Sequence, residues 1–106
     1  MNQHPVWPHV DRLLPRFRAL SDAVWATPET CYAEHASVAL HIEELQHQGF
    51  RIKPNIADIP TAVVGEWGED GPVIAFLGEY DALAALSQEA DLDRPSPVEE
   101  GANGHG

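Results

Sequence analysis

The chain has 106 residues, of which 43% are hydrophobic and 22% charged, and its formal net charge is −11 at pH 7. This length suits one small domain, and no apolar run reaches the ~18 residues that a membrane span needs. Residues 54–106 hold eleven Asp or Glu residues and a single basic residue, Arg94. Because this acidic stretch would repel a polyanion, nucleic acid is not an expected partner. A membrane is not expected either, since no apolar run is long enough to span one. The acidic residues of 54–106 either keep the protein soluble or contribute to a cation-binding environment.

The start of the chain and its cysteine content bear on location. Residues 1–7 show neither a basic n-region nor an apolar h-region, so no secretory signal is visible. The single cysteine, Cys31, excludes an internal disulfide. A reducing, cytoplasmic environment is therefore expected.

The first predicted helix follows a loose arm over residues 1–10. Apolar residues then recur at the spacing of one helix face, at Leu13, Leu14, Phe17, Leu20 and Val24. Proline lacks a backbone N–H and its ring clashes with the preceding turn, so this helix either begins near Pro15 or is kinked there. It should end before Pro28, which disfavours helical geometry at Thr27.

A second helix is predicted over residues 31–48, with Val38, Ala39, Ile42 and Leu45 on its apolar face. Gly49 is suited to the left-handed position that follows such a helix. Phe50 would then contact Leu45 in a Schellman ending.

The remaining pattern predicts short strands at 50–53, 61–67 and 72–77. The third is apolar throughout, which is typical of a central strand covered on both faces by helices, and the second and third are expected to form a hairpin. Residues 84–106 are expected to be an irregular loop whose far anchor is missing. The fold class is therefore α/β: two helices followed by a mixed sheet of about three strands.

Two acidic residues at the end of the third strand are candidates for a site. Glu79 and Asp81 are two positions apart, so they point to the same side if the strand geometry continues. Chemistry in α/β proteins sits at such strand ends. The pair could bind a metal or orient one of its ligands, or it could be two solvated loop acids.

The other chemically capable residues give weaker signals. Cys31 is either a nucleophile or an incidental thiol, and no His or Asn stands at a recognisable spacing from it. His105 lies between glycines, and Gly101, Gly104 and Gly106 would let the backbone approach a ligand closely. No two histidines have the i, i+4 spacing of a helical zinc motif, so no metal is expected to bind this chain alone. The six histidines are His4, His9, His35, His41, His47 and His105.

Several separated blocks nevertheless resemble a known family in the right order. The segment Trp25-Ala26-Thr27-Pro28-Glu29-Thr30 is similar to the His-Pro-Glu segment of the di-metal amidohydrolases, which include aminoacylases and carboxypeptidases. The block Gly78-Glu79-Tyr80-Asp81-Ala82-Leu83 resembles their Asp-Met-Asp-Ala-Leu-Pro block. Together with Leu86-Ser87-Gln88 and Gly104-His105-Gly106, the pattern is closest to the branch that hydrolyses p-aminobenzoyl-glutamate.

The resemblance implies that residues 1–106 are a single incomplete N-terminal part of a zinc-peptidase-like catalytic domain. It carries over one catalytic residue, Asp81, whose family role is to orient and polarise the metal centre. Glu79 stands where other branches have a ligand His, His105 matches a motif His that is not a ligand, and Thr27 replaces the usual His before Pro-Glu. The family's metal ligands and its general-base Glu would follow this sequence.

The function implied for the complete enzyme is hydrolysis of an amide between an acyl or aryl group and an amino acid, with zinc or manganese as cofactor. The 106-residue chain alone is expected to be inactive and to bind no metal or other cofactor. The alternative is a non-catalytic remnant, or a half-enzyme that pairs with another polypeptide. The expected partners are a small N-acyl amino acid for the complete enzyme, and self-association or a complementing subunit for the chain.

Overall fold

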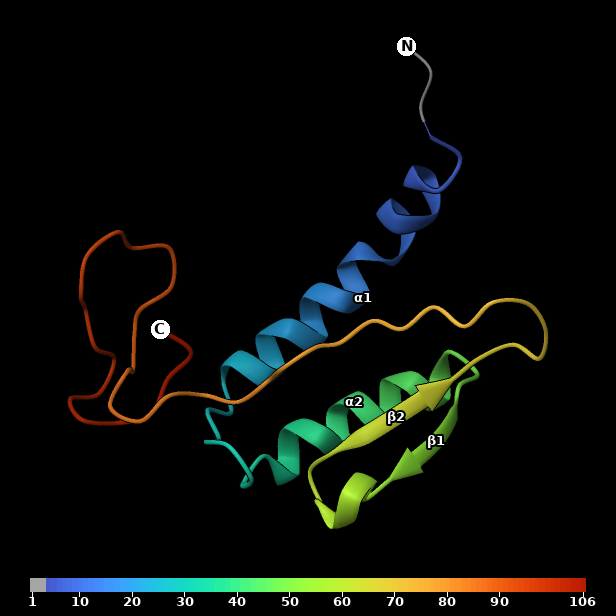
Figure 1. Ribbon diagram of the computed structural model, residues 1–106. Coiled ribbons are helices and arrows are strands. Elements are labelled where there is room, and N and C mark those ends of the chain that lie inside the picture. The colour runs from blue at the N-terminus through green and yellow to red at the C-terminus, as the bar shows by residue number, and fades with distance from the viewer. Residues whose placement is uncertain (1–3) are drawn as a thin grey trace.

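The computed structural model describes residues 4–106 (Figure 1). Two helices, α1 (Trp7–Trp25) and α2 (His35–His47), are followed by strand β1 (Arg51–Pro54), a short 3-10 turn η1 (Ile56–Asp58) and strand β2 (Val63–Glu66). Beyond β2 the chain forms only isolated bridges and turns up to Gly106. No helix in the described range is long and apolar enough to cross a bilayer.

Helix α1 begins earlier than the sequence predicts and continues through Pro15. Residues 7–10, expected in a loose arm, are helical, and residues 1–3 of that arm lie outside the described range. Pro8 explains the early start, because a proline in the first turn loses no hydrogen bond there and its fixed φ suits a helix. The helix therefore does not begin at Pro15.

Helix α2 begins four residues later than predicted but ends as predicted. Gly49 has φ +88°, the N–H of Phe50 donates to the carbonyl of Leu45 at 2.9 Å, and the N–H of Gly49 donates to Gln46 at 3.0 Å. These two bonds are those of a Schellman motif. The side chains of Leu45 and Phe50 both pack against Gly65 of β2, so the helix ending also docks α2 on the hairpin.

Gly49→Ala is expected to lower the free energy of unfolding by about 1 kcal/mol, because an L-residue is strained at this positive φ. Urea denaturation followed by circular dichroism would measure the loss. Gly78→Ala is the matched control, since Gly78 has no left-handed backbone and no atom within 4 Å of an added Cβ. Equal stability of both variants would contradict the prediction.

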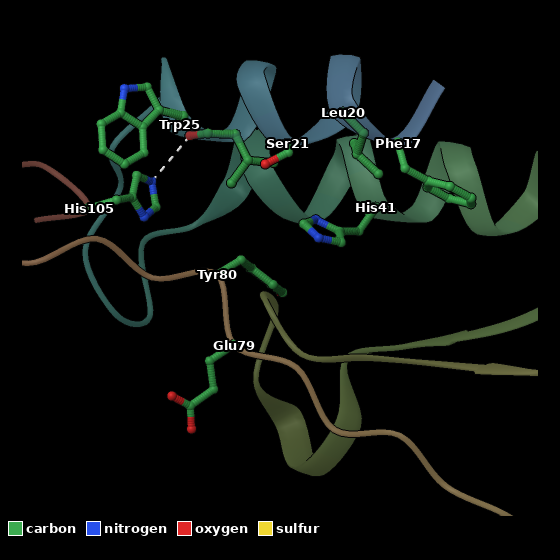
Figure 2. Close-up of a pocket in the computed structure, with 9 residues that line it drawn as sticks. Phe17, Leu20, Ser21, Trp25, His41, Glu79, Tyr80 and His105 are labelled. Carbon is green, nitrogen blue, oxygen red and sulfur yellow. Dashed lines mark hydrogen bonds between the residues drawn. The ribbon is translucent and has the colours of Figure 1, made fainter. Parts of the chain in front are cut away.

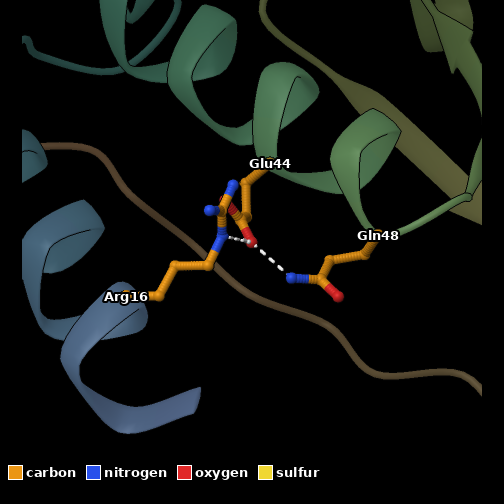
Figure 3. Close-up of polar contacts among 3 residues, drawn as sticks. All are labelled: Arg16, Glu44 and Gln48. Carbon is orange, nitrogen blue, oxygen red and sulfur yellow. Dashed lines mark hydrogen bonds and ion pairs between the residues drawn. The ribbon is translucent and has the colours of Figure 1, made fainter.

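One ion pair joins the two helices on their exposed side (Figure 3). The Nε of Arg16 lies 2.8 and 2.9 Å from the two carboxylate oxygens of Glu44, and Gln48 donates to the same carboxylate at 2.7 Å. Hydrogen bonds from Arg16 and Gln48 hold the pKa of Glu44 below its usual value. Because Arg16 is 43% exposed, this pair fixes the helix orientation more than it stabilises the fold.

The sheet has two strands rather than three, and its hairpin joins the first and second predicted strands. β1 and β2 pair antiparallel, with Arg51 opposite Glu66 and Pro54 opposite Val63. The predicted hairpin between the second and third strands is wrong. Among the described residues none pairs with 72–77, which run as an extended coil across Figure 1. A strand needs a partner at its edge, and this part of the chain supplies none.

Many large apolar side chains are exposed. Among residues 4–106, only Val38 and Ala82 are buried hydrophobic residues, at 6% and 2% exposure. The radius of gyration is 16.5 Å, against about 13 Å for a compact chain of ~100 residues. The accessible surface is 8426 Å², against roughly 5,800 Å² for a compact protein of this mass. The helices and the hairpin therefore enclose little core.

Candidate functional site

Asp81 lies in a short stretch of backbone that is anchored on both sides. The N–H of Ala82 donates to the carbonyl of Glu29 at 2.7 Å, and Ala82 forms a parallel bridge with Thr30. On the other side, the hydroxyl of Tyr80 donates a short hydrogen bond to the carbonyl of Thr61. These bonds fix the backbone at Asp81 beside the loop that joins α1 to α2.

The same loop supplies the cap of α2. The two carboxylate oxygens of Glu29 accept the backbone N–H groups of Ala36 and Ser37 at 3.0 and 2.7 Å, in the first turn of the helix. Desolvation alone would raise the pKa of Glu29, but the hydrogen bonds from Ala36 and Ser37 outweigh it and the pKa is lowered. Glu29 thus stabilises α2 by its charge as well as by its two hydrogen bonds.

Glu29→Ala is expected to lower the free energy of unfolding by about 1 kcal/mol, as the loss of a helix cap does. A carboxyl with a lowered pKa in the folded state stabilises above its unfolded pKa, near 4.5, and loses that contribution as the pH falls through the lowered value. Glu29→Gln should therefore flatten the acid limb of stability against pH. Urea denaturation between pH 7 and pH 3 would measure both effects.

The control for this experiment is Glu100→Ala, which removes an exposed acid from the 84–106 loop. It should leave the stability at pH 7 within about 0.5 kcal/mol of the original. An acid limb of the same slope in the Glu29→Gln protein would show that Glu29 does not act through its charge.

Tyr80 connects the anchored stretch to α2. Its ring stacks on the imidazole of His41, with ring centroids 4.7 Å apart and an interplanar angle of 26°. Nδ1 of His41 donates to the carbonyl of Ser37 at 2.8 Å, which leaves Nε2 as the free nitrogen. Burial raises the pKa of the Tyr80 phenol, and the charges of Glu34 and Glu29 raise it further. Tyr80 is thus a neutral hydrogen-bond donor that holds the segment around Asp81 in place.

His105 reaches the same region from the C-terminal loop. Its imidazole stacks on Trp25 with centroids 5.9 Å apart, and Nε2 donates to the carbonyl of Val24 at 3.2 Å. The loop is held by paired backbone bonds between Leu83 and Gly104, at 2.8 and 3.0 Å. Gly104 does permit a close approach as predicted, but to another backbone: a Cβ there would lie 2.2 Å from the carbonyl oxygen of Leu86.

These side chains line an open cavity beside α1, as Figure 2 shows. Its volume is about 340 Å³. Tyr80 and His41 form one side, and His105 with Trp25 forms another. Glu79 is also at the rim, but its carboxylate points away from the rings. Glu79 lines this cavity and Asp81 does not. The full lining is Phe17, Leu20, Ser21, Val24, Trp25, His41, Glu79, Tyr80 and His105.

Two buried polar atoms next to the cap have no hydrogen-bond partner among the described residues. They are Oγ of Ser37, whose residue is 0% exposed, and Oε2 of Glu34, whose residue is 8% exposed. Burying such groups without a partner carries a free-energy cost. Within residues 4–106, no three His, Cys, Asp or Glu side chains are gathered as a metal site would require.

Several of these residues were not singled out from the sequence. The capping role of Glu29 links it to positions seven and eight residues later, outside the usual local capping patterns. Glu29 does belong to the Pro-Glu segment of the family resemblance, which was the only signal for it.

Cys31, the other candidate from the sequence, has an exposed free thiol.

The comparisons with known proteins agree with that resemblance. Over 91 residues the chain is 43% identical to a p-aminobenzoyl-glutamate hydrolase subunit of Escherichia coli (strain K12), a match that covers 86% of this chain and 19% of that protein. It is also 36% identical over 88 residues to Xaa-Arg dipeptidase of Mus musculus, covering 73% of this chain and 20% of that protein. No family model and no solved structure matches the chain.

The chain is therefore similar to hydrolases of the amidohydrolase and peptidase family, and the predicted resemblance is confirmed. More particularly, it resembles the p-aminobenzoyl-glutamate hydrolase subunit of E. coli. The chain spans about a fifth of the length of the curated relatives that it matches.

Proposed function

We propose that this chain contributes to a metal-dependent amidohydrolase that cleaves amides between an acyl or aryl group and an amino acid, with p-aminobenzoyl-glutamate as the leading substrate. The observation that carries the proposal is the coincidence of sequence and geometry at Asp81. The two segments that resemble the family, around Pro28-Glu29 and around Asp81, are bonded to each other through Glu29 and Ala82 at 2.7 Å. The identity of 43% to a p-aminobenzoyl-glutamate hydrolase subunit supports the substrate class.

The residues of this chain do not fit a metal centre by themselves. The described residues bring no three ligand-type side chains together, and Glu79 and Asp81 do not share a cavity. The metal ligands and the general base are therefore assigned to the part of the enzyme beyond this chain. The role of this chain is to hold the Asp81 carboxylate on an anchored backbone segment, bounded by Tyr80 and Ala82.

A chimera of the two proteins would test the proposal. In this chimera, residues of this chain replace the matching stretch of the E. coli hydrolase subunit. The chimera is expressed in an E. coli strain that lacks its own copy of that subunit. The expected result is restored hydrolysis of p-aminobenzoyl-glutamate in extracts, with the intact E. coli subunit as the reference. A chimera that accumulates as a folded protein but hydrolyses no p-aminobenzoyl-glutamate and no other N-acyl amino acid would refute it.

The 106-residue chain alone is expected to retain no metal after dialysis. A stable zinc site needs at least three fixed ligands, and the described residues do not gather them. Elemental analysis after incubation with zinc or manganese would check this. One tightly held zinc or manganese ion per chain would contradict both this prediction and the assignment of the ligands to the rest of the enzyme.

The alternative function is a half-enzyme or a non-catalytic remnant that acts only by pairing with a second polypeptide. Its support is the uncovered apolar surface of the structure. The half-enzyme form of this alternative leads to the same hydrolase, because the pairing partner would then carry the missing ligands.

A further inference from the structure

Helix α1 carries an apolar stripe whose first half is open to solvent. Its positions follow one another at alternating spacings of three and four residues, which is the period of a coiled-coil seam. Trp7 and Val10 are 55% and 51% exposed, and Leu14 and Phe17 are 39% and 40% exposed. We call this stripe the α1 seam; it consists of Trp7, Val10, Leu14, Phe17, Ser21 and Val24.

The α1 seam lies to one side of the face that α1 turns toward α2. On that face Arg16 makes the ion pair to Glu44, and the nearby Leu13 and Leu20 are only partly exposed. With 3.6 residues per turn, the α1 seam lies about a third of a turn away from these residues. Figure 1 shows the N-terminal half of α1 reaching away from α2 and the hairpin. A second helix therefore has access to the seam.

The distribution of charge determines where two copies of this chain can meet. The chain has a net charge of −11, so its acidic parts repel one another between copies. Helix α1 is different, because it holds three of the six basic residues and only two of the seventeen acidic ones. Repulsion between two copies is therefore weaker along α1 than along the acidic stretch 54–106.

Two charged residues flank the α1 seam on the side away from α2. Asp11 and Arg18 are both exposed, and within residues 4–106 neither makes an ion pair. In an antiparallel pair of α1 helices with Leu14 of one copy opposite Phe17 of the other, Asp11 of each copy lies beside Arg18 of the other. In a parallel pair the same two residues lie about two turns apart. We propose that the α1 seam is a self-association surface through which two copies of this chain pair antiparallel.

The same register brings Trp7 of the second copy to the open cavity beside α1. It sets that Trp7 opposite Val24, which lines the cavity together with Phe17. The exposed indole is then covered, and the apolar side of the cavity gains a neighbour. This pairing uses none of the residues around Asp81, so it does not rest on the proposed hydrolase function.

Sedimentation equilibrium of the 106-residue chain over a roughly hundredfold range of concentration would test the proposal, since a short seam gives a reversible, concentration-dependent dimer. Leu14→Glu places a charge in the seam and is expected to raise the dimer dissociation constant about tenfold or more. The matched control is Val73→Glu, the same kind of change at a residue 95% exposed outside α1, which should leave the constant unchanged. Circular dichroism of both variants would verify that the helices are retained.

A charge exchange tests the antiparallel arrangement. Arg18→Asp sets like charges beside each other twice in the dimer and is expected to raise the dissociation constant roughly threefold or more. The double variant Asp11→Arg with Arg18→Asp should restore the original constant, because each pair is then remade with its signs reversed. A double variant as weak as the single one would overturn the antiparallel pairing.

Three other results would overturn the self-association surface itself. One is a chain that stays monomeric at every concentration. Another is association that Val73→Glu weakens as much as Leu14→Glu does, since the seam would then not be responsible. The third is a monomer that binds vesicles containing anionic phospholipid and loses that binding in Leu14→Glu, which would assign the seam to a membrane surface.

Discussion

Asp81→Asn is expected to lower p-aminobenzoyl-glutamate hydrolysis by the chimeric enzyme roughly 10–100-fold, the typical loss when a carboxylate that positions a metal ligand is removed. The substitution keeps the size of the side chain and removes its charge. Because the neighbouring backbone is held by the hydrogen bonds of Tyr80 and Ala82, the backbone at Asp81 should not move. The loss should therefore be one of chemistry rather than of folding.

The kinetic pattern separates these two explanations. A positioning role predicts a lower kcat with little change in KM, together with partial recovery at raised metal concentration. In the 106-residue chain the same substitution should change the free energy of unfolding by less than about 0.5 kcal/mol, as at an ordinary surface site. Steady-state kinetics across a metal titration, paired with urea denaturation of the isolated chain, would measure both.

Asp93→Asn is the control, because it removes an exposed acid from the 84–106 loop and leaves the anchored segment around Asp81 unchanged. It should leave kcat, KM and the metal dependence unchanged. Full activity of the Asp81→Asn chimera would mean that Asp81 is not a site residue. A large loss of stability in the isolated chain would instead assign Asp81 a structural role.

Local sequence signals predicted local structure well here. The end of α2 follows directly from Gly49 and Phe50, because a Schellman motif is completed within six residues. The identity of the two helices and of the first two strands also follows from periodicity. The start of α2 was predicted too early, since its capping group, Glu29, lies outside the helix and its position depends on the folded loop.

Non-local structure could not be predicted in the same way. The apolar run 73–77 has the composition of a central strand, but a strand forms only where a partner edge is available. Likewise, the stacking of His105 on Trp25 and its bond to Val24 join positions about eighty residues apart. Nothing in the spacing of the histidines indicated that contact. The family resemblance identified Asp81, while its anchoring through Tyr80 and Ala82 became visible only in the structure.

The isolated chain is expected to unfold with a free energy below the usual ~5–15 kcal/mol of natural domains. Only two hydrophobic residues in the described range are buried, and an accessible surface of 8426 Å² means that about half of the unfolded chain's surface stays exposed. The gain from apolar burial is correspondingly small, whereas ordering the two helices and the hairpin costs conformational entropy for every residue. The balance leaves little net stability.

Urea denaturation and size-exclusion chromatography with light scattering would test this expectation. The chain alone is expected to unfold at low urea. If the chain pairs with a second polypeptide such as the E. coli hydrolase subunit without its matching stretch, the transition should move to higher urea, because a partner that binds only the folded state stabilises it by mass action. Phe76→Asp should abolish that shift while leaving the transition of the isolated chain nearly unchanged, since Phe76 is 94% exposed there. A monodisperse monomer with a cooperative transition above about 5 kcal/mol would show that this chain needs no partner to complete its core.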